Sequence, residues 1–206
     1  MRKKRFAVLL AAVFMVLGFA GCLYNEIPAN QDSSETTSAA ADEIDFHYVT
    51  DWSLDDMVQS IEMNGVTYSM PFTLNDLGNK YSLEWVGVDF EENGKVDHYT
   101  YVLKYCDMVY AGIEVFDPFD FNDMDNYKIT SIILTSDTDF KFGGVDPEST
   151  KDNILEKFGE PSYISSDYNM FAYMFDGGDD NLDSSVVVGF NDDNEMLKVI
   201  AIRYYK

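Results

Sequence analysis

Cysteine and histidine are both scarce in this chain of 206 residues, which contains two of each: Cys22, Cys106, His47 and His98. Two cysteines cannot form the disulfide framework that stabilises many small secreted domains. The two histidines lack a partner at the spacing of a zinc motif, and glycine-rich nucleotide loops and the GxSxG serine motif are missing. We therefore expect the protein not to be an enzyme and to carry no resident cofactor.

Positive charge is scarce as well, because 14 Lys and Arg residues stand against 37 Asp and Glu residues, for a formal net charge of −23. So acidic a surface repels phosphate groups and anionic lipid headgroups. The composition therefore excludes nucleic acid as a partner. It favours cations or a basic partner instead.

A long apolar run is also missing, but a shorter one, residues 6–20, follows the basic residues 2–5. A transmembrane helix needs about 20 apolar residues, so this run is too short to span a bilayer comfortably. A basic start, a short apolar run and the small residue Gly21 are typical of a secretory signal peptide. We expect residues 1–21 to be removed, which leaves a mature chain with a formal charge of −27.

Cys22 stands directly after this segment, in the context Phe19-Ala20-Gly21-Cys22. The arrangement resembles the lipobox of bacterial lipoproteins, although Phe19 replaces the leucine that the family prefers. The resemblance implies that Cys22 carries palmitate and other acyl chains and holds the protein on the extracytoplasmic face of the cell membrane. An ordinary signal peptide with an unrelated cysteine, or an uncleaved anchor, is the alternative.

Residues 22–43 are mostly polar or small and show no hydrophobic periodicity, so we expect a flexible tether. Beyond it, three capping boxes indicate helix starts. They predict a helix over residues 53–62, a single turn after Thr73, and a helix over residues 149–158 that begins at Ser149.

The rest of the chain consists of short alternating segments separated by turn residues, which indicates antiparallel strands. The expected fold class is therefore α+β, with short helices packed on an antiparallel sheet. Two related halves, residues 44–135 and 136–206, would each contain a capped helix followed by a meander of strands. A single domain of about 160 residues is the alternative.

The segment from Gly144 to Pro161 contains a glycine, a short helix and the stop Phe158-Gly159-Glu160-Pro161, and aromatic strands follow it. This pattern resembles the repeat of SmpA/OmlA-type bacterial lipoproteins and the tandem halves of the β-lactamase-inhibitor-protein (BLIP) fold. Residues 64–77 resemble the opening of surface lipoproteins of Gram-positive anaerobes. The resemblance implies a two-layer unit whose open sheet face binds a protein, and it transfers no catalytic residue.

Aromatic residues supply the candidate binding face. Phe171, Tyr173 and Phe175 share one side of a predicted strand, and Tyr204 lies in the last strand. If this side faces solvent, these four residues can bind a partner. In the alternative, the aromatic side forms the core and the residues between them face outward.

An acidic turn supplies the candidate metal site, formed by Asp176, Asp179, Asp180 and Asp183. Calcium prefers six to eight hard oxygen ligands, so weak Ca²⁺ binding is one hypothesis. The EF-hand spacing is absent, and a solvated hairpin turn is the other interpretation.

The remaining polar candidates favour structural roles. We expect both histidines at the surface, and Cys106 buried in a strand. The predicted function is that of a membrane-anchored, non-enzymatic module that binds a protein or an envelope ligand. The alternatives are a cell-envelope hydrolase that uses a carboxylate pair and a small solute-binding lipoprotein.

Overall fold

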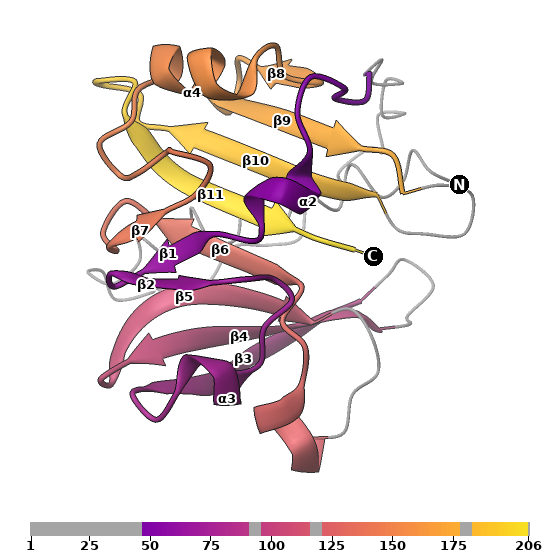
Figure 1. Cartoon of the computed structure of the whole chain (residues 1–206), viewed down its shortest axis with the longest axis vertical. Helices are drawn as coiled ribbons and strands as arrows, with labels where there is room; N and C mark the ends of the chain where they lie inside the picture. The colour runs from indigo at the N-terminus through magenta and orange to yellow at the C-terminus, as the bar shows by residue number, and fades with distance from the viewer. Residues whose placement is uncertain (1–46, 91–95, 116–120, 178–182, 206) are drawn as a thin grey trace, which may run out of the picture. The chain divides into compact units, whose positions relative to one another are not determined.

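The described part of the chain has an α+β fold, in which short helices pack on an antiparallel sheet as the sequence predicts (Figure 1). None of the described helices is long and apolar enough to cross a membrane. The computed structural model describes residues 47–90, 96–115, 121–177 and 183–205, with the backbone alone described at 89–90, 96–97 and 121–122.

Eight strands form the main sheet, and every neighbouring pair is antiparallel. In spatial order they are β3 (Tyr81–Phe90), β4 (Val96–Tyr105), β5 (Met108–Val115), β6 (Ser131–Thr135), β11 (Leu197–Arg203), β10 (Ser184–Phe190), β9 (Met170–Phe175) and β8 (Tyr163–Ser165).

The strand order is symmetric about the middle of the sheet. Strands β3 to β6 form one meander, β8 to β11 form another, and the last strands of the two meanders, β6 and β11, pair with each other. The three central registered pairs are aliphatic, such as Leu134 with Ile200 and Ile132 with Ile202, and the pair at one end joins Arg203 to Ser131. The centre of the seam between the meanders therefore consists of aliphatic side chains, which suit a pleated, packed surface.

A helix precedes each meander: α3 (Leu74–Leu77) precedes the first and α4 (Lys151–Phe158) the second. One backbone hydrogen bond recurs at both helix starts. The N–H of Ile129 donates to the carbonyl of Phe72 at 2.7 Å, and the N–H of Leu197 donates to the carbonyl of Ser149 at 2.8 Å. Each bond joins the residue before a helix cap to the segment around the start of its last strand. The division into halves at residue 135 remains a prediction.

The two helix caps have the same chemistry. Thr73 and Thr150 are the N-cap residues, and each completes a capping box with the third residue of its helix, Asp76 or Asn153. The prediction of a capping box at Thr73 is thus confirmed, but the prediction of a cap at Ser149 was one residue too early. The hydroxyl of Ser149 instead donates to Asp146, so it is already used in the preceding turn.

The predicted helix over residues 53–62 is wrong in length, because α2 spans only Leu54–Met57. The end of the predicted helix instead begins the β-strand β1 (Ile61–Met63). Asn64 and Gly65 adopt positive φ angles of 51° and 72°, which make a tight hairpin turn. That turn pairs β1 with β2 (Val66–Tyr68), and β1 also pairs with β7 (Phe140–Lys141) to form a small three-stranded sheet.

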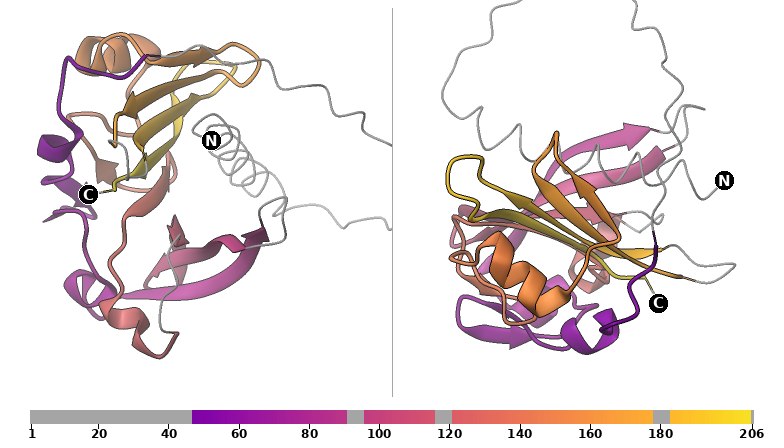
Figure 2. Two further views of the ribbon diagram at one scale, coloured as in Figure 1. Left: turned by 90° about the vertical axis from the view of Figure 1, so that its right-hand side faces the viewer. Right: turned by 90° about the horizontal axis from the view of Figure 1, so that it is seen from above.

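One hydrophobic core runs through both meanders. It lies between the large sheet and the layer formed by the helices and the small sheet, and Figure 2 shows this layer on the convex side of the curved large sheet. Above the second meander, Phe158 of α4 and Phe142 pack on the sheet with ring centroids 6.0 Å apart. The core is therefore continuous across both meanders. Its two ends differ in the helix that covers them, which is α3 over the first meander and α4 over the second.

Candidate functional site

The aromatic residues predicted as a binding face belong to the core. Phe171, Tyr173 and Tyr204 are 6%, 0% and 3% exposed, so they are not available to a partner. Phe175 is half-buried, with its ring centroid 4.7 Å from that of Trp52. The aromatic side of the strand faces the helices and belongs to the core, as in the alternative interpretation. The residues between the aromatics do not face outward, however, because Met170, Ala172 and Met174 are 2%, 0% and 5% exposed.

The predicted calcium site is described only in part. Asp179 and Asp180 lie outside the described residues. The carboxylate of Asp183 accepts hydrogen bonds from Gly177 N–H at 3.2 Å and from the hydroxyl of Tyr48 at 3.3 Å, while Asp176 is exposed. Among the described residues, no three acidic, histidine or cysteine side chains are grouped as a metal site.

A buried ionic cluster, which the sequence analysis missed, crosses the middle of the sheet. Glu114 accepts hydrogen bonds from Arg203 Nε and Nη2, both at 2.8 Å, and from Ser131 at 3.0 Å. His98 lies on the same side of the sheet, with Nε2 3.9 Å from Glu114. The prediction that His98 lies at the surface is wrong, because the side chain is 3% exposed. The sequence signal that could have revealed this cluster is the presence of Glu114 and Arg203 inside predicted strands.

Ser185 is the strand partner of Arg203, and its hydroxyl has no hydrogen-bond partner. The contacts of Glu114 with Arg203 and Ser131 supply the partners that a buried carboxylate requires.

Cys106 is also misplaced by the sequence analysis, because it is exposed rather than buried. Cys106 and Asp107 form the two-residue turn between β4 and β5, both with positive φ. The predicted strand extended one residue too far, since positive φ at non-glycine residues carries no strong sequence signal.

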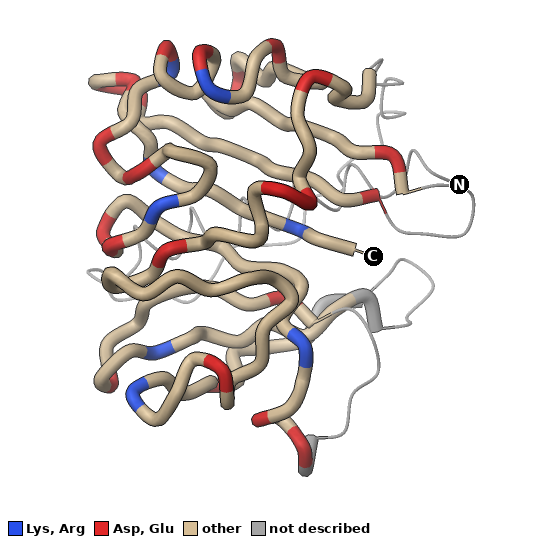
Figure 3. Tube along the Cα trace, viewed as in Figure 1, with Lys and Arg blue, Asp and Glu red and all other residues tan. Residues whose placement is uncertain are grey.

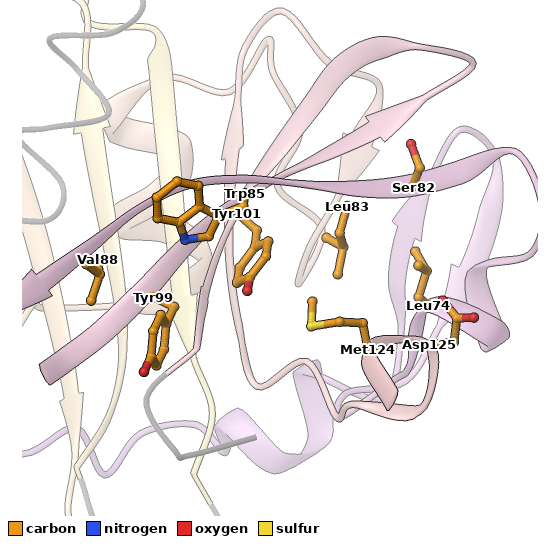
Figure 4. A pocket seen from close by; sticks show the side chains of 9 residues that line it. All are labelled: Leu74, Ser82, Leu83, Trp85, Val88, Tyr99, Tyr101, Met124 and Asp125. Carbon is orange, nitrogen blue, oxygen red and sulfur yellow. The ribbon is translucent and has the colours of Figure 1, made fainter. Parts of the chain in front are cut away.

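An open groove at the β3–β4 end of the sheet is a candidate site formed by described residues, and we call it the Trp85 groove. Its volume is about 670 Å³, within the range of small-molecule pockets. Trp85, on the edge strand β3, is 59% exposed and contributes its indole to the wall (Figure 4). The groove is lined by Leu74, Ser82, Leu83, Trp85, Val88, Tyr99, Tyr101, Met124 and Asp125.

A β-bulge places the strand residues of this groove. Trp85 pairs with Tyr101, but the next registered pair is Gly87 with Thr100, so Val86 is an extra residue. The extra residue shifts the alternation, and Val88, three positions after Trp85, returns to the same face. Without the bulge Val88 would point to the other side of the sheet.

The opposite wall is formed by α3 and the 3₁₀ segment η1 (Phe121–Asn126). The side-chain amide of Asn75 donates to Asn126 at 2.9 Å, and Asn126 donates to Asp123 at 2.6 Å. These bonds join α3 to η1 and hold Met124 and Asp125 across from the strands. Because α3 has only four residues, it covers β3 near its start and leaves the Trp85 end open.

The chemistry of the groove is aromatic and acidic. Its three rings, Trp85, Tyr99 and Tyr101, come from two neighbouring strands, and Asp125 is the only charged residue among the lining side chains that the structure describes. Burial raises the pKa of the Tyr101 phenol, and the neighbouring Tyr99 raises it further. The phenol of Tyr101 therefore stays neutral at physiological pH. The arrangement can bind an apolar body and can pair with a positive charge.

No protein-family model, curated protein or solved structure matches the chain. The resemblance to SmpA/OmlA-type and BLIP-type proteins therefore remains a prediction from the sequence. Cys22 and the rest of the N-terminal segment lie outside the described residues, so acylation also remains a prediction.

Proposed function

We propose that the protein is a membrane-anchored extracytoplasmic lipoprotein that binds a ligand without transforming it, and that the Trp85 groove is its binding site. The observation that carries the proposal is the exposed indole of Trp85, which lines an apolar groove instead of completing the core. Burying a large aromatic surface is the main source of affinity at such sites.

The anchor rests on the order of basic residues 2–5, the apolar run 6–20 and Cys22. A flexible tether of about 20 residues has a mean span of roughly 25 Å, which would place the folded part clear of the lipid headgroups. The groove would then be accessible to molecules in the cell envelope.

The non-enzymatic role is supported by the acidic lining of the groove. Hydrolysis by a carboxylate pair needs two carboxyl groups about 5–9.5 Å apart on either side of the bond that is cleaved. Among the described lining residues Asp125 is the single carboxylate, and the other members are aromatic, aliphatic, serine or methionine. The described lining therefore fits binding of a ligand better than hydrolysis by a carboxylate pair.

The test uses the two tryptophans of the chain, Trp52 and Trp85, as separate probes. The chain from residue 22 onward, with Cys22→Ser, retains every described residue and is titrated with the neutral probe 2-phenylethanol. We expect the indole N–H resonance of Trp85 to shift with saturation and that of Trp52 to stay, because the Trp52 indole already donates to the Phe158 carbonyl at 2.7 Å.

A Trp85 signal that does not respond would contradict the assignment of the site. The anchor is tested in the full chain, where Cys22→Ala should abolish acylation and move the protein from the membrane fraction to the soluble fraction. Mass spectrometry that finds the mature N-terminus at another residue would remove the anchor.

A further inference from the structure

We infer that the ligand of the Trp85 groove is an organic ammonium compound with an apolar or aromatic body. This inference rests on the proposed function, since it specifies the ligand class of the same site. It follows from how charge and aromatic rings are distributed around the groove.

The first argument is the sign of the charge. Among the described residues, no lysine or arginine lines the groove, and the one charged side chain in the lining is the carboxylate of Asp125. The whole chain carries a formal net charge of −23, and Figure 3 shows acidic positions in the loops and helices of both ends of the described fold. An anionic ligand would be repelled by Asp125 at short range and by the net negative charge at long range. A cation would be attracted by both.

The second argument is the chemistry of the rings. The faces of tryptophan and tyrosine rings carry negative electrostatic potential, so they attract ammonium groups within about 6 Å. Trp85, Tyr99 and Tyr101 supply three such rings within one groove. A carbohydrate ligand would also stack on Trp85, but it needs many polar partners. Among the described lining residues, the polar side-chain groups are those of Ser82 and Asp125, the two tyrosine hydroxyls and the indole N–H of Trp85.

The third argument is the shape of the groove. In Figure 4 Trp85, Tyr99 and Val88 lie toward one end, while Leu74, Ser82 and Asp125 lie toward the other. Leu83 and Met124 occupy the stretch between the two ends. An elongated ligand therefore contacts rings at one end, aliphatic side chains along its body, and the carboxylate at the far end.

Addition of a peptide strand to the edge of the sheet is a weaker explanation of this region. Strand β3 is the edge strand, but its pairing is interrupted by bulges after Trp85 and after Asp89. Bulges twist an edge and break the regular row of backbone donors and acceptors that an added strand needs. The groove beside the edge is therefore the better binding surface.

The experiment compares three probes of similar size: 2-phenylethylamine, which is a cation at pH 7, neutral 2-phenylethanol and anionic 3-phenylpropionate. Each is titrated into the chain from residue 22 onward, and binding is followed at the Trp85 indole N–H, with Trp52 as the internal reference. We expect the amine to bind about five- to tenfold more tightly than the alcohol at low salt, and the carboxylate to bind more weakly than both. The preference should shrink in 1 M salt.

Two variants with the same change of charge locate the effect. Asp125→Asn should weaken binding of the amine about threefold and leave binding of the alcohol unchanged. Glu84→Gln is the matched control, because Glu84 adjoins Trp85 on β3 but points to the other side, where it pairs with Lys104. This variant should leave the amine-to-alcohol ratio unchanged. Trp85→Ala, followed by calorimetry, should abolish binding of both probes.

Each outcome decides between the two proposals. If the alcohol or the carboxylate binds as tightly as the amine, the inference about charge is overturned while the groove remains a binding site. If no probe moves the Trp85 signal, both proposals fail. If the preference for the amine survives Asp125→Asn and Trp85→Ala alike, the amine is adsorbing to the acidic surface in general, and the inference is again overturned.

Discussion

The two tryptophans mark a difference between the two ends of the sheet. At the α4 end, the Trp52 ring stacks on Phe158 with centroids 5.0 Å apart and meets Phe175 edge-on. At the α3 end, Trp85 is 59% exposed, and no described residue stacks on its indole or hydrogen-bonds to it. The same residue type thus completes the core at one end and lines a groove at the other.

Helix length is the physical origin of this difference. The eight residues of α4 bury Ile154 and Phe158 over the second meander, whereas the four residues of α3 bury only Leu77 over the first. The caps at Thr73 and Thr150 and the glycines that end both helices are alike. A binding site can therefore arise when the helix that covers a sheet is shortened while its capping residues at both ends are kept.

The largest expected effect comes from removing each indole in turn. Trp52→Ala should lower the free energy of unfolding by about 3 kcal/mol, because it leaves a cavity among aromatic rings. Trp85→Ala should change it by less than about 0.5 kcal/mol, as at other exposed sites. Urea unfolding followed by circular dichroism measures both. Equal losses would show that Trp85 belongs to the core and would end the comparison.

A second, smaller contrast concerns two glycines with positive φ. A Cβ at Gly143 would lie 2.7 Å from Met57 Sδ and 2.9 Å from Phe158 Cε1, whereas a Cβ at Gly65 would meet nothing within 4 Å. Gly143→Ala should therefore cost about 2 kcal/mol, from strain and overpacking together, and Gly65→Ala about 1 kcal/mol, from backbone strain alone. Thermal unfolding of the two variants provides the measurement. A larger loss at Gly65 would mean that the α4 end is not tightly filled.

The smallest expected effect is a difference in pH dependence between the capping boxes of α3 and α4. Hydrogen bonds from the backbone and then the side chain of Thr73 lower the pKa of Asp76 below its ordinary value. A lowered pKa in the folded state means that the cap contributes above the unfolded pKa of about 3.9 and is lost as the pH falls through the folded value. Asn153, the counterpart in α4, does not titrate.

Acid should therefore shift the amide resonance of Thr73 strongly, because its N–H donates to the Asp76 carboxylate, whereas the Thr150 N–H donates to the Asn153 amide oxygen and should shift less. An NMR titration from pH 5 to pH 2.5 measures this directly, and Asp76→Asn should remove the response at α3. A simultaneous change at both helices would point to general acid unfolding instead.

Local sequence signals predicted much of the fold. The strand that contains Phe171, Tyr173 and Phe175 forms as predicted, Thr73 caps the predicted turn, and the second predicted helix ends at Phe158 as expected. Each of these features depends on neighbours within a few residues. The helix expected over residues 53–62 failed because β1 pairs both with β2 and with the distant β7, and pairing of this kind overrides helical periodicity.

The candidate site could not be predicted in the same way. Its walls come from α3, β3, β4 and η1, and its geometry depends on a bulge after Trp85 that leaves no clear sequence signature. The aromatic residues that alternate most clearly in the sequence, such as Phe171 and Tyr173, are core residues. Alternation shows which residues share a face of a strand, but not whether a helix covers that face.

The symmetric strand order has a consequence for folding. Strand β11 follows every other strand of the large sheet along the chain, yet it lies in the middle of that sheet between β6 and β10. The two meanders are therefore joined only when β11 has been synthesised and has paired with β6. Because this pairing joins residues far apart in the chain, we expect the whole sheet to form more slowly than either meander alone.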